Sequence, residues 1–242
     1  MDTYVINLDR SEDRLREFRR RNSHMPDIHR FSAVDGSTID REELIESNTF
    51  TSGLPYTDGA VGAALSHMFF WEAAKAENAV ITVCEDDAIF HRQFPELSAR
   101  FIAGLRDDWD IVLWGWNLDS ILLFDLMPGV SHCLATFDQE KMRAGADIFQ
   151  ELPIVPGAFR LLRAFGIVCY TISPRGASAM LDRSLPLRPL KVAFPMVHPE
   201  FPNNGIDIVM NDAYPGMNAF VSFPPLVVTK NEHAISTIQT AR

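Results

Sequence analysis

The chain has 242 residues, of which 47% are hydrophobic and 22% charged, a composition typical of globular proteins. This length allows one sizeable α/β domain or two small ones. The net charge of -10 argues against a nucleic-acid-binding protein, which needs a basic surface to displace counterions from phosphate. An acidic protein that binds an anionic ligand needs a local cation, either a divalent metal or a small arginine cluster.

The cysteines and the N-terminal residues indicate in which cellular compartment the protein works. The three cysteines, Cys84, Cys133 and Cys169, show neither a disulfide framework nor a zinc-binding spacing. The first residues lack the basic and apolar regions of a secretory signal. No apolar run approaches the roughly 20 residues of a membrane-spanning helix. We therefore expect a cytoplasmic enzyme without a transmembrane segment, for which peripheral membrane contact stays open.

The first half of the chain alternates between predicted strands and helices. Its opening β-α-β order is typical of a parallel sheet. Apolar residues at i, i+3 and i+4 predict a helix beginning at Gly59. The expected strands cover residues 3–8, 29–34, 79–84 and 110–114. One further helix is expected to begin after a Ser11 cap, and two more are expected at residues 38–48 and 94–105.

The second half is less regular. Residues 118–163 show no clear period, and five prolines in residues 185–204 argue against the interior of a helix or strand there. The tail carries Pro224 and Pro225. The expected elements are strands at 165–172 and 219–223 and helices at 174–181 and 206–212.

Three adjacent carboxylates follow the apolar run Ala79–Cys84, which is typical of a central strand buried on both faces. They are Glu85, Asp86 and Asp87. In open α/β sheets ligands bind beyond the carboxyl ends of the strands. Carboxylate oxygens suit Mg²⁺ or Mn²⁺, which keep positions for phosphate oxygens. The triplet therefore predicts a metal and phosphate site, with a solvated strand exit as the alternative.

Charged residues after the first two strands are further candidates. Arg10 and Arg14 lie one helical turn apart, a spacing that suits two guanidinium groups binding a diphosphate. Solvation at the surface is the alternative. Asp35, before Gly36, either accepts hydrogen bonds from a ribose or uracil, or shapes a turn.

Two apparent motifs argue against other enzyme classes. Ser66 and His67 are neighbours on a predicted helix, so they point about 100° apart and cannot pair as nucleophile and base. A structural hydrogen bond of His67 is the alternative. The segment from Gly59 to Gly62 matches the dinucleotide-binding glycine pattern poorly, because no strand leads into it. We reject a dehydrogenase and read these glycines as a helix start.

Together these segments resemble glycosyltransferase family 25, the group of lipooligosaccharide and collagen galactosyltransferases. The likeness covers residues 3–117 and resumes near 165–182. The segments that carry it are Val5-Ile6-Asn7-Leu8-Asp9-Arg10 with Arg14, Ala33-Val34-Asp35-Gly36, Gly62-Ala63-Ala64-Leu65-Ser66-His67, Val83-Cys84-Glu85-Asp86-Asp87 and Ile172-Ser173-Pro174-Arg175-Gly176-Ala177.

The resemblance implies an α/β fold of the GT-A type, with a mostly parallel central sheet flanked by helices and a variable acceptor-binding part. Residues 1–242 would form one glycosyltransferase domain. Within it, residues 1–117 would bind the nucleotide-sugar, and residues 118–242 would bind the acceptor.

The resemblance also implies an inverting transfer of galactose or glucose from a UDP-sugar to a glycan, lipooligosaccharide or protein acceptor, with Mn²⁺ or Mg²⁺ as cofactor. Asp87 and Asp86 would hold the metal, and Glu85 would contact the sugar or ribose. The remaining donor-site residues would be Asn7, Leu8, Arg10, Arg14 and Asp35 around the uridine, and Ser66 and His67 near the diphosphate.

An inverting enzyme needs a general base near the acceptor hydroxyl. The resemblance points to an acidic residue in the last third, for which Asp207 is the first choice and Asp212 the second. Helix capping or a surface position is the alternative for each. Trp114, Trp116 and Phe124 are candidates for a stacking platform for the acceptor sugar, or else for the core.

Two other functions remain open from the sequence. A catalytically silent relative would keep the fold and act as a binding module, but we expect such a protein to lose the acidic triplet. A metal-dependent phosphohydrolase would use the same carboxylates, and would need further Asp or His ligands at a defined spacing.

Overall fold

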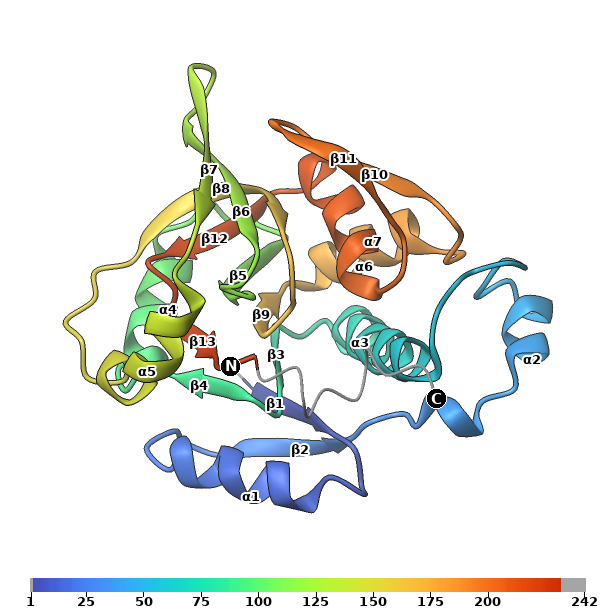
Figure 1. The fold of residues 1–242 in the computed structure, drawn as a ribbon, viewed down its shortest axis with the longest axis horizontal. Coiled ribbons are helices and arrows are strands. Elements are labelled where there is room, and N and C mark those ends of the chain that lie inside the picture. Colours follow the sequence, from blue (N-terminus) through green and yellow to red (C-terminus); the bar gives the residue numbers. More distant parts are fainter. Residues whose placement is uncertain (1, 232–242) are drawn as a thin grey trace.

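The computed structural model describes residues 2–231, apart from the side chains of residues 197–199. A nine-stranded sheet runs through the molecule, with helices packed on both of its faces (Figure 1). Its strands are β1 (Asp2–Asn7), β2 (Ile28–Ser32), β3 (Ile81–Glu85), β5 (Ile111–Gly115), β6 (Ile121–Met127), β7 (Ser131–Thr136), β8 (Gly157–Ala164), β9 (Cys169–Ile172) and β12 (Ala219–Phe223). Two smaller sheets pair β4 (Ala88–Phe90) with β13 (Val227–Thr229), and β10 (Lys191–Phe194) with β11 (Val197–Pro202).

The central sheet is mixed, so the prediction of a mostly parallel sheet is wrong. The strand order is β2-β1-β3-β9-β5-β12-β8-β6-β7. Only β1 with β2, β1 with β3, and β5 with β12 pair in parallel. Strand β9 runs antiparallel to both β3 and β5, between which it lies. Apolar strands buried on both faces look alike in sequence whichever way they run, so their composition does not reveal direction.

The two faces of the sheet carry separate layers of the core. Along β5, Ile111 and Leu113 face the cluster that includes α3, α6 and α7, while Val112 and Trp114 face the cluster of α1 and α4. This explains the uninterrupted apolar strands, because both faces are covered. The helices are α1 (Glu12–Arg21), α2 (Arg41–Glu46), α3 (Asp58–Ala76), α4 (Phe94–Ala103), α5 (Gln139–Phe149), α6 (Pro174–Ser184) and α7 (Ile206–Ala213), with short 3-10 turns at Gly36–Thr38 and Tyr214–Gly216.

The predicted elements of the first half are confirmed, with boundaries that move by a few residues. Ser11 takes the N-cap position of α1, although its side chain makes no capping bond. The long region without pattern is not irregular: it forms β6, β7, α5 and β8, of which β6 and β7 make a projecting hairpin (Figure 1). The proline-rich segment forms the ribbon of β10 and β11, where each strand has an unpaired edge that tolerates proline.

Three aromatic residues predicted as a possible sugar platform belong to the core. Trp114, Trp116 and Phe124 are 0%, 1% and 2% exposed. They pack against other rings, such as Phe94 and Phe223, and are closed to a ligand. Within the described part of the chain, no helix has the length and apolar character needed to cross a membrane.

Candidate active site

The carboxyl ends of β1, β2 and β3 meet at one edge of the central sheet. The register pairs Ile6 of β1 with Glu85 of β3, and Asn7 with Ser32 of β2. The residues that follow each strand are therefore neighbours. This places the acidic triplet beside Asn7 and beside the loop that carries Asp35, as expected for a ligand site in an α/β sheet.

Asp86 is anchored by residues of the first β-α unit. Asn7 Nδ2 donates to Asp86 Oδ2 over 2.7 Å, and Arg14 Nε donates to Asp86 Oδ1 over 2.8 Å. Arg14 also forms an ion pair with this carboxylate. Burial alone would lower the pKa of Arg14, but the Asp86 hydrogen bond and the charges of the triplet raise it above its ordinary value. Both oxygens of Asp86 are engaged within the fold, so this residue orients the triplet.

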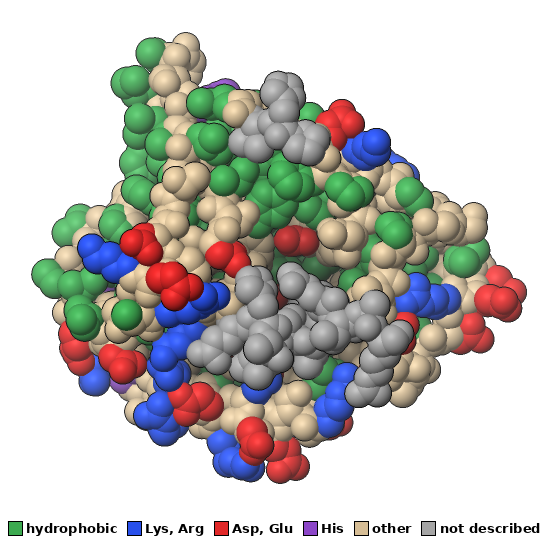
Figure 2. Space-filling model, viewed as in Figure 1, with side chains coloured by type: hydrophobic (Ala, Val, Ile, Leu, Met, Phe, Trp, Pro, Cys, Tyr) green, Lys and Arg blue, Asp and Glu red, His purple; other side chains and the backbone are tan. Residues whose placement is uncertain are grey.

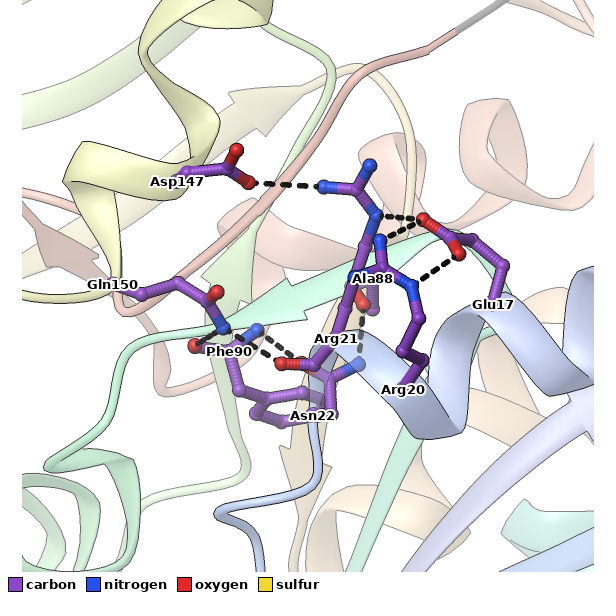
Figure 3. A network of polar contacts seen from close by, with 8 residues as sticks. All are labelled: Glu17, Arg20, Arg21, Asn22, Ala88, Phe90, Asp147 and Gln150. Atoms are coloured by element: carbon purple, nitrogen blue, oxygen red, sulfur yellow. Dashed lines mark hydrogen bonds and ion pairs between the residues drawn. The ribbon is translucent and has the colours of Figure 1, made fainter.

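The end of α1 fixes the chain on the other side of Asp87 (Figure 3). The buried Asn22 side chain donates to the Ala88 carbonyl over 2.8 Å and accepts from the Phe90 amide over 2.9 Å. The Asn22 side chain thereby satisfies a carbonyl and an amide of β4, as a neighbouring strand would. In the same network Gln150 of the α5 end donates to the Phe90 carbonyl over 3.0 Å. Because Asp86 and β4 are both tied to α1, Asp87 between them is held in place.

Six acidic residues line one cavity of about 720 Å³. Two of them, Asp13 and Glu17, lie on α1, and the other four come together from two distant parts of the sequence. Glu85, Asp86 and Asp87 lie at the end of β3, and Asp207 lies in the first turn of α7. Asp207 Oδ1 accepts from the Ile208 amide over 2.9 Å, and its Oδ2 accepts from the Gly166 amide over 3.3 Å. The first choice for the general base therefore faces the acidic triplet.

Burial and like charge perturb three of these carboxyl groups. Burial, reinforced by Asp87 and Asp86, raises the pKa of Glu85 to about 8. Burial also raises the pKa of Asp87, an effect that Arg14 partly offsets. The pKa of Asp207 is raised by burial against the opposing effect of its two backbone donors. Carboxylates crowded in this way are stabilised by a bound cation.

Asp87 is the residue of the cavity whose chemistry suits a divalent ion that is coordinated partly by the protein and partly by substrate. Asp87 Oδ1 is buried and has no hydrogen-bond partner within the described residues, while the Thr229 hydroxyl bonds to the same carboxyl group. Residues 2–231 contain no preformed cluster of three or more His, Cys, Asp or Glu ligands. That arrangement is compatible with Mg²⁺-type binding, in which one or two carboxylates combine with substrate phosphates and water.

A second cavity of about 550 Å³ adjoins the first, with Arg14, Glu85 and Asp86 in the lining of both. It contains most of the residues predicted to bind the nucleotide, namely Leu8, Arg10, Asp35, Ser66 and His67. Asn7 is buried beneath it and lines neither cavity.

Arg10 and Asp35 form an ion pair across the second cavity. Asp35 Oδ1 also accepts from the Ser37 amide over 3.1 Å and from the Ser37 hydroxyl over 2.7 Å. These hydrogen bonds come first among the causes that lower the pKa of Asp35, ahead of the Arg10 charge. Asp35 therefore shapes its turn and at the same time presents a carboxylate to the cavity.

Ser66 and His67 line the second cavity, yet both are tied into the fold. Ser66 Oγ accepts from the Val34 amide over 2.9 Å and donates to the Gly62 carbonyl over 2.7 Å. His67 Nδ1 lies 3.1 Å from the Tyr170 hydroxyl, which also accepts from Trp71. Burial lowers the pKa of His67 to about 3, so at neutral pH it offers no positive charge to a diphosphate.

The start of α3 lies against both cavities. The sequence predicted this helix but not the contribution of Thr57 to the site. Thr57 lines both of them and caps the helix, accepting from the Ala60 amide over 3.1 Å. Gly62 lets the helix approach the loop after β2: an added Cβ would lie 2.9 Å from the Gly36 nitrogen and closer still to the Val34 carbonyl oxygen. Gly62 thus serves close packing of the helix against this loop.

A family profile described as Glycosyltransferase family 25 (LPS biosynthesis protein) matches residues 1–196. The chain belongs to glycosyltransferase family 25. A curated family 25 relative, the glycosyltransferase 25 family member of Aedes aegypti, is 31% identical over 124 residues. The match covers 46% of this chain and 20% of the relative, so the chain spans about a fifth of that protein's length. A solved structure, the crystal structure of A197 from STIV, matches all of both chains with 12% identity and a TM-score of 0.38.

Membership of family 25 confirms the resemblance drawn from the five segments and classes the chain among the glycosyltransferases. The acidic triplet and the second cavity lie within the matched range. Asp207 lies beyond it, and its place in the site comes from the structure alone.

Two predicted residues of this family 25 chain, Asn7 and Asp212, line neither cavity, and the structure adds other residues to the site. Asn7 contacts the site by its hydrogen bond to Asp86. Asp212 is exposed on α7 and lines neither cavity, so it is not placed to act as a base. Asn117, at the end of β5, lines the larger cavity, and its side chain packs where a Cβ on Gly166 would stand. A polar residue after an apolar strand was the signal for Asn117. The other cavity residues not foreseen include Thr57, Asn204, Lys230 and Asn231.

Proposed function

We propose that this chain is an inverting, metal-dependent glycosyltransferase that moves galactose or glucose from a UDP-sugar to a glycan, lipooligosaccharide or protein acceptor. One observation carries the proposal. Carboxylates from β3 and from α7 line a single cavity, and this cavity adjoins a pocket formed at the carboxyl ends of β1 and β2. A donor that spans both would put its nucleoside in the smaller pocket and its sugar in the larger.

Residues 1–117 supply most of the donor site in this proposal, as in the GT-A type of fold. The pocket with Leu8, Arg10 and Asp35 receives the uridine, whose hydroxyl and amide groups pair with the Asp35 carboxylate. Thr57 and the first turn of α3 face the diphosphate. The N-terminus of a helix favours anions because its backbone amides and dipole point toward them.

Asp87 is the residue that would hold the divalent ion, with Asp86 oriented beside it by Asn7 and Arg14. When bound, Mn²⁺ or Mg²⁺ neutralises charge on the diphosphate of the leaving group. Glu85 lies at the junction of the two cavities and hydrogen-bonds the sugar or ribose hydroxyls. Arg14 contributes by fixing Asp86.

Asp207 acts as the general base. The acceptor hydroxyl oxygen attacks the anomeric carbon as the bond from this carbon to the diphosphate oxygen breaks, and UDP leaves with the electron pair. Asp207 takes the hydroxyl proton. Its carboxylate is oriented by the Gly166 and Ile208 amides, and burial raises its pKa, which strengthens it as a base.

Residues 118–242 supply the acceptor side. Asn204 and Gly205, in the turn before α7, and Asp207, in the first turn of α7, line the larger cavity together with the triplet. Figure 2 shows an acidic side chain recessed near the centre of this face of the molecule, and acidic and basic side chains intermixed along the lower edge of the face. An acceptor hydroxyl that enters the larger cavity meets Asp207 and the sugar together.

The direct test is a thermal shift with UDP-hexoses in the presence and absence of Mn²⁺. A ligand that binds only the folded protein raises its melting temperature, by an amount that grows with its concentration relative to the dissociation constant. We expect UDP-galactose or UDP-glucose with Mn²⁺ to raise the melting temperature more than either component alone. Absence of a shift with every UDP-sugar, with and without metal, would refute the proposal.

The variant Asp87→Ala tests the proposed metal ligand. It should abolish UDP release with the fold retained, because it removes the proposed metal ligand and leaves the Asp86 anchor intact. Unchanged turnover would refute the metal assignment. Release of UDP from the wild-type protein at the same rate with and without any acceptor would favour a hydrolase over a transferase.

A further inference from the structure

Three cationic residues line the acidic cavity, and two of them already form ion pairs with carboxylates. Arg14 is paired with Asp86, and Arg21 is paired with Glu17 and Asp147 (Figure 3). For the third, Lys230, no ion pair with a carboxylate is formed within residues 2–231. Among the described residues, no carboxylate of the cavity pairs with Lys230, so Lys230 is available to bind a ligand.

The backbone at Lys230 is clamped by α5. The Lys230 carbonyl accepts from Gln139 Nε2 over 2.9 Å and from Arg143 Nε over 2.8 Å. Arg143 also donates to the Asn231 carbonyl over 2.9 Å and is itself held by Glu140 over 2.7 Å. Lys230 follows the end of β13, where no strand among the described residues pairs with the backbone. The hydrogen bonds from Gln139 and Arg143 therefore fix the position of the Lys230 backbone.

The residues on either side of Lys230 also belong to the cavity. Thr229 is paired with Ala88 across β13 and β4, and its hydroxyl bonds to the Asp87 carboxyl group. Asn231 lines the cavity, and its Nδ2 is buried with no hydrogen-bond partner among the described residues. The Thr229 hydroxyl therefore bonds to Asp87, and the two residues that follow it, Lys230 and Asn231, line the same cavity and bring a cation and an amide donor to its wall.

We infer that Lys230 binds the diphosphate of the nucleotide donor and that Arg143 is the positioning residue that holds it there. The inference rests on the proposed function. A diphosphate placed beside the acidic triplet and Asp207 is repelled unless fixed cations offset their charge, and an ammonium on a flexible stem can follow a phosphate oxygen. Asn231 Nδ2 supplies a second donor to the same group.

Lys230 also acts during the transfer step. When the bond from the anomeric carbon to the diphosphate oxygen breaks, the electron pair stays on that oxygen and the departing diphosphate gains one negative charge. The ammonium stabilises this charge and gives up no proton. Its contribution is therefore larger in the transition state than in the bound donor.

The test compares the binding of UDP and of uridine to Lys230→Met, in the presence of Mn²⁺, by calorimetry. Methionine keeps much of the apolar stem and removes the charge. We expect UDP binding to weaken roughly 10- to 100-fold, the loss of one charge-assisted hydrogen bond, while uridine binding is unchanged. Lys230→Arg should retain most of the affinity for UDP. Lys191→Met, at an exposed position of β10 that lines neither cavity, is the matched control and should bind UDP normally.

A double-mutant cycle tests the positioning role. Arg143→Ala should weaken UDP binding less than Lys230→Met does, and should add little once Lys230 is already methionine, because Arg143 acts through the lysine. Full additivity of the two losses would refute that role. Melting temperatures of all variants establish that each is folded.

The outcomes separate this inference from the proposed function. If Lys230→Met binds UDP as tightly as the wild type, or loses uridine to the same degree, Lys230 does not bind the diphosphate, and the proposed function stands. If the wild type binds neither UDP nor any UDP-sugar, with or without Mn²⁺, the proposed function fails, and this inference fails with it.

Discussion

Gly62 offers a test of how the nucleotide pocket is built. The glycine lies in α3, where the helix meets the loop from Val34 to Gly36. A Cβ at this position would lie 2.9 Å from the Gly36 nitrogen and closer still to the Val34 carbonyl oxygen. Both atoms belong to the backbone and cannot rotate away. We expect Gly62→Ala to separate the helix from the loop that carries Asp35.

The expected magnitude follows from two opposing effects. Replacing glycine by alanine within a helix stabilises it by about 1 kcal/mol. Overpacking against fixed atoms costs about 1–3 kcal/mol, and backbone on both sides favours the upper end. The net expectation is a loss of about 2 kcal/mol in the free energy of unfolding. For a chain of this size that corresponds to a fall of roughly 4–8 °C in melting temperature.

Gly145→Ala is the matched control. Gly145 lies inside α5, and an added Cβ there would meet nothing within 4 Å. The same substitution should therefore raise stability, by about 0.5–1 kcal/mol. Thermal melts and urea titrations of both variants measure the difference, and UDP titrations of Gly62→Ala should show weakened binding. If both glycines gained stability on replacement, the close approach of α3 to the loop would be refuted.

Two further predictions concern the catalytic carboxylate and the buried histidine. Asp207→Asn should lower kcat at least 100-fold and leave the affinity for UDP nearly unchanged, because general-base catalysis contributes roughly 100-fold or more. A normal rate in a transfer assay would show that another residue is the base. His67 should make stability fall with acid: burial lowers its pKa to about 3, so below its ordinary value of 6.5 the unfolded chain binds a proton that the folded chain does not. Between pH 6.5 and 5.5 the wild type should therefore lose about 1 kcal/mol relative to His67→Gln in urea unfolding, and parallel pH profiles of the two proteins would contradict this.

The parts of the site that could be predicted from sequence are those fixed by local patterns. The apolar run before Glu85 identifies a buried strand, and charged residues must leave the core where such a strand ends. The acidic triplet was therefore predictable from a single stretch of chain. Asp207 was expected as the base only because the family resemblance points to an acidic residue in the last third, and its place in the cavity comes from the structure.

Hydrogen-bond partners from distant segments could not be predicted. Arg14 and Ser66 were expected to face a ligand, but each is engaged by a residue that lies far away in sequence, Asp86 and Val34. The direction of β9 was missed for a related reason, because direction depends on how the chain returns to the sheet. The hairpin of β6 and β7 was missed because neither strand alternates between apolar and polar residues. β6 is an apolar run interrupted only by Asp125 and is paired on both sides, and β7, at the edge of the sheet, is only partly buried.

The place of β12 in the central sheet has a consequence for synthesis on the ribosome. This strand comes late in the chain, yet it lies between β5 and β8 and pairs with both. Until residues 219–223 have emerged, the growing polypeptide carries two unpaired strand edges, which invite pairing with other chains. The nascent protein should therefore depend on chaperone protection until that strand is inserted, and truncation before it should yield insoluble product.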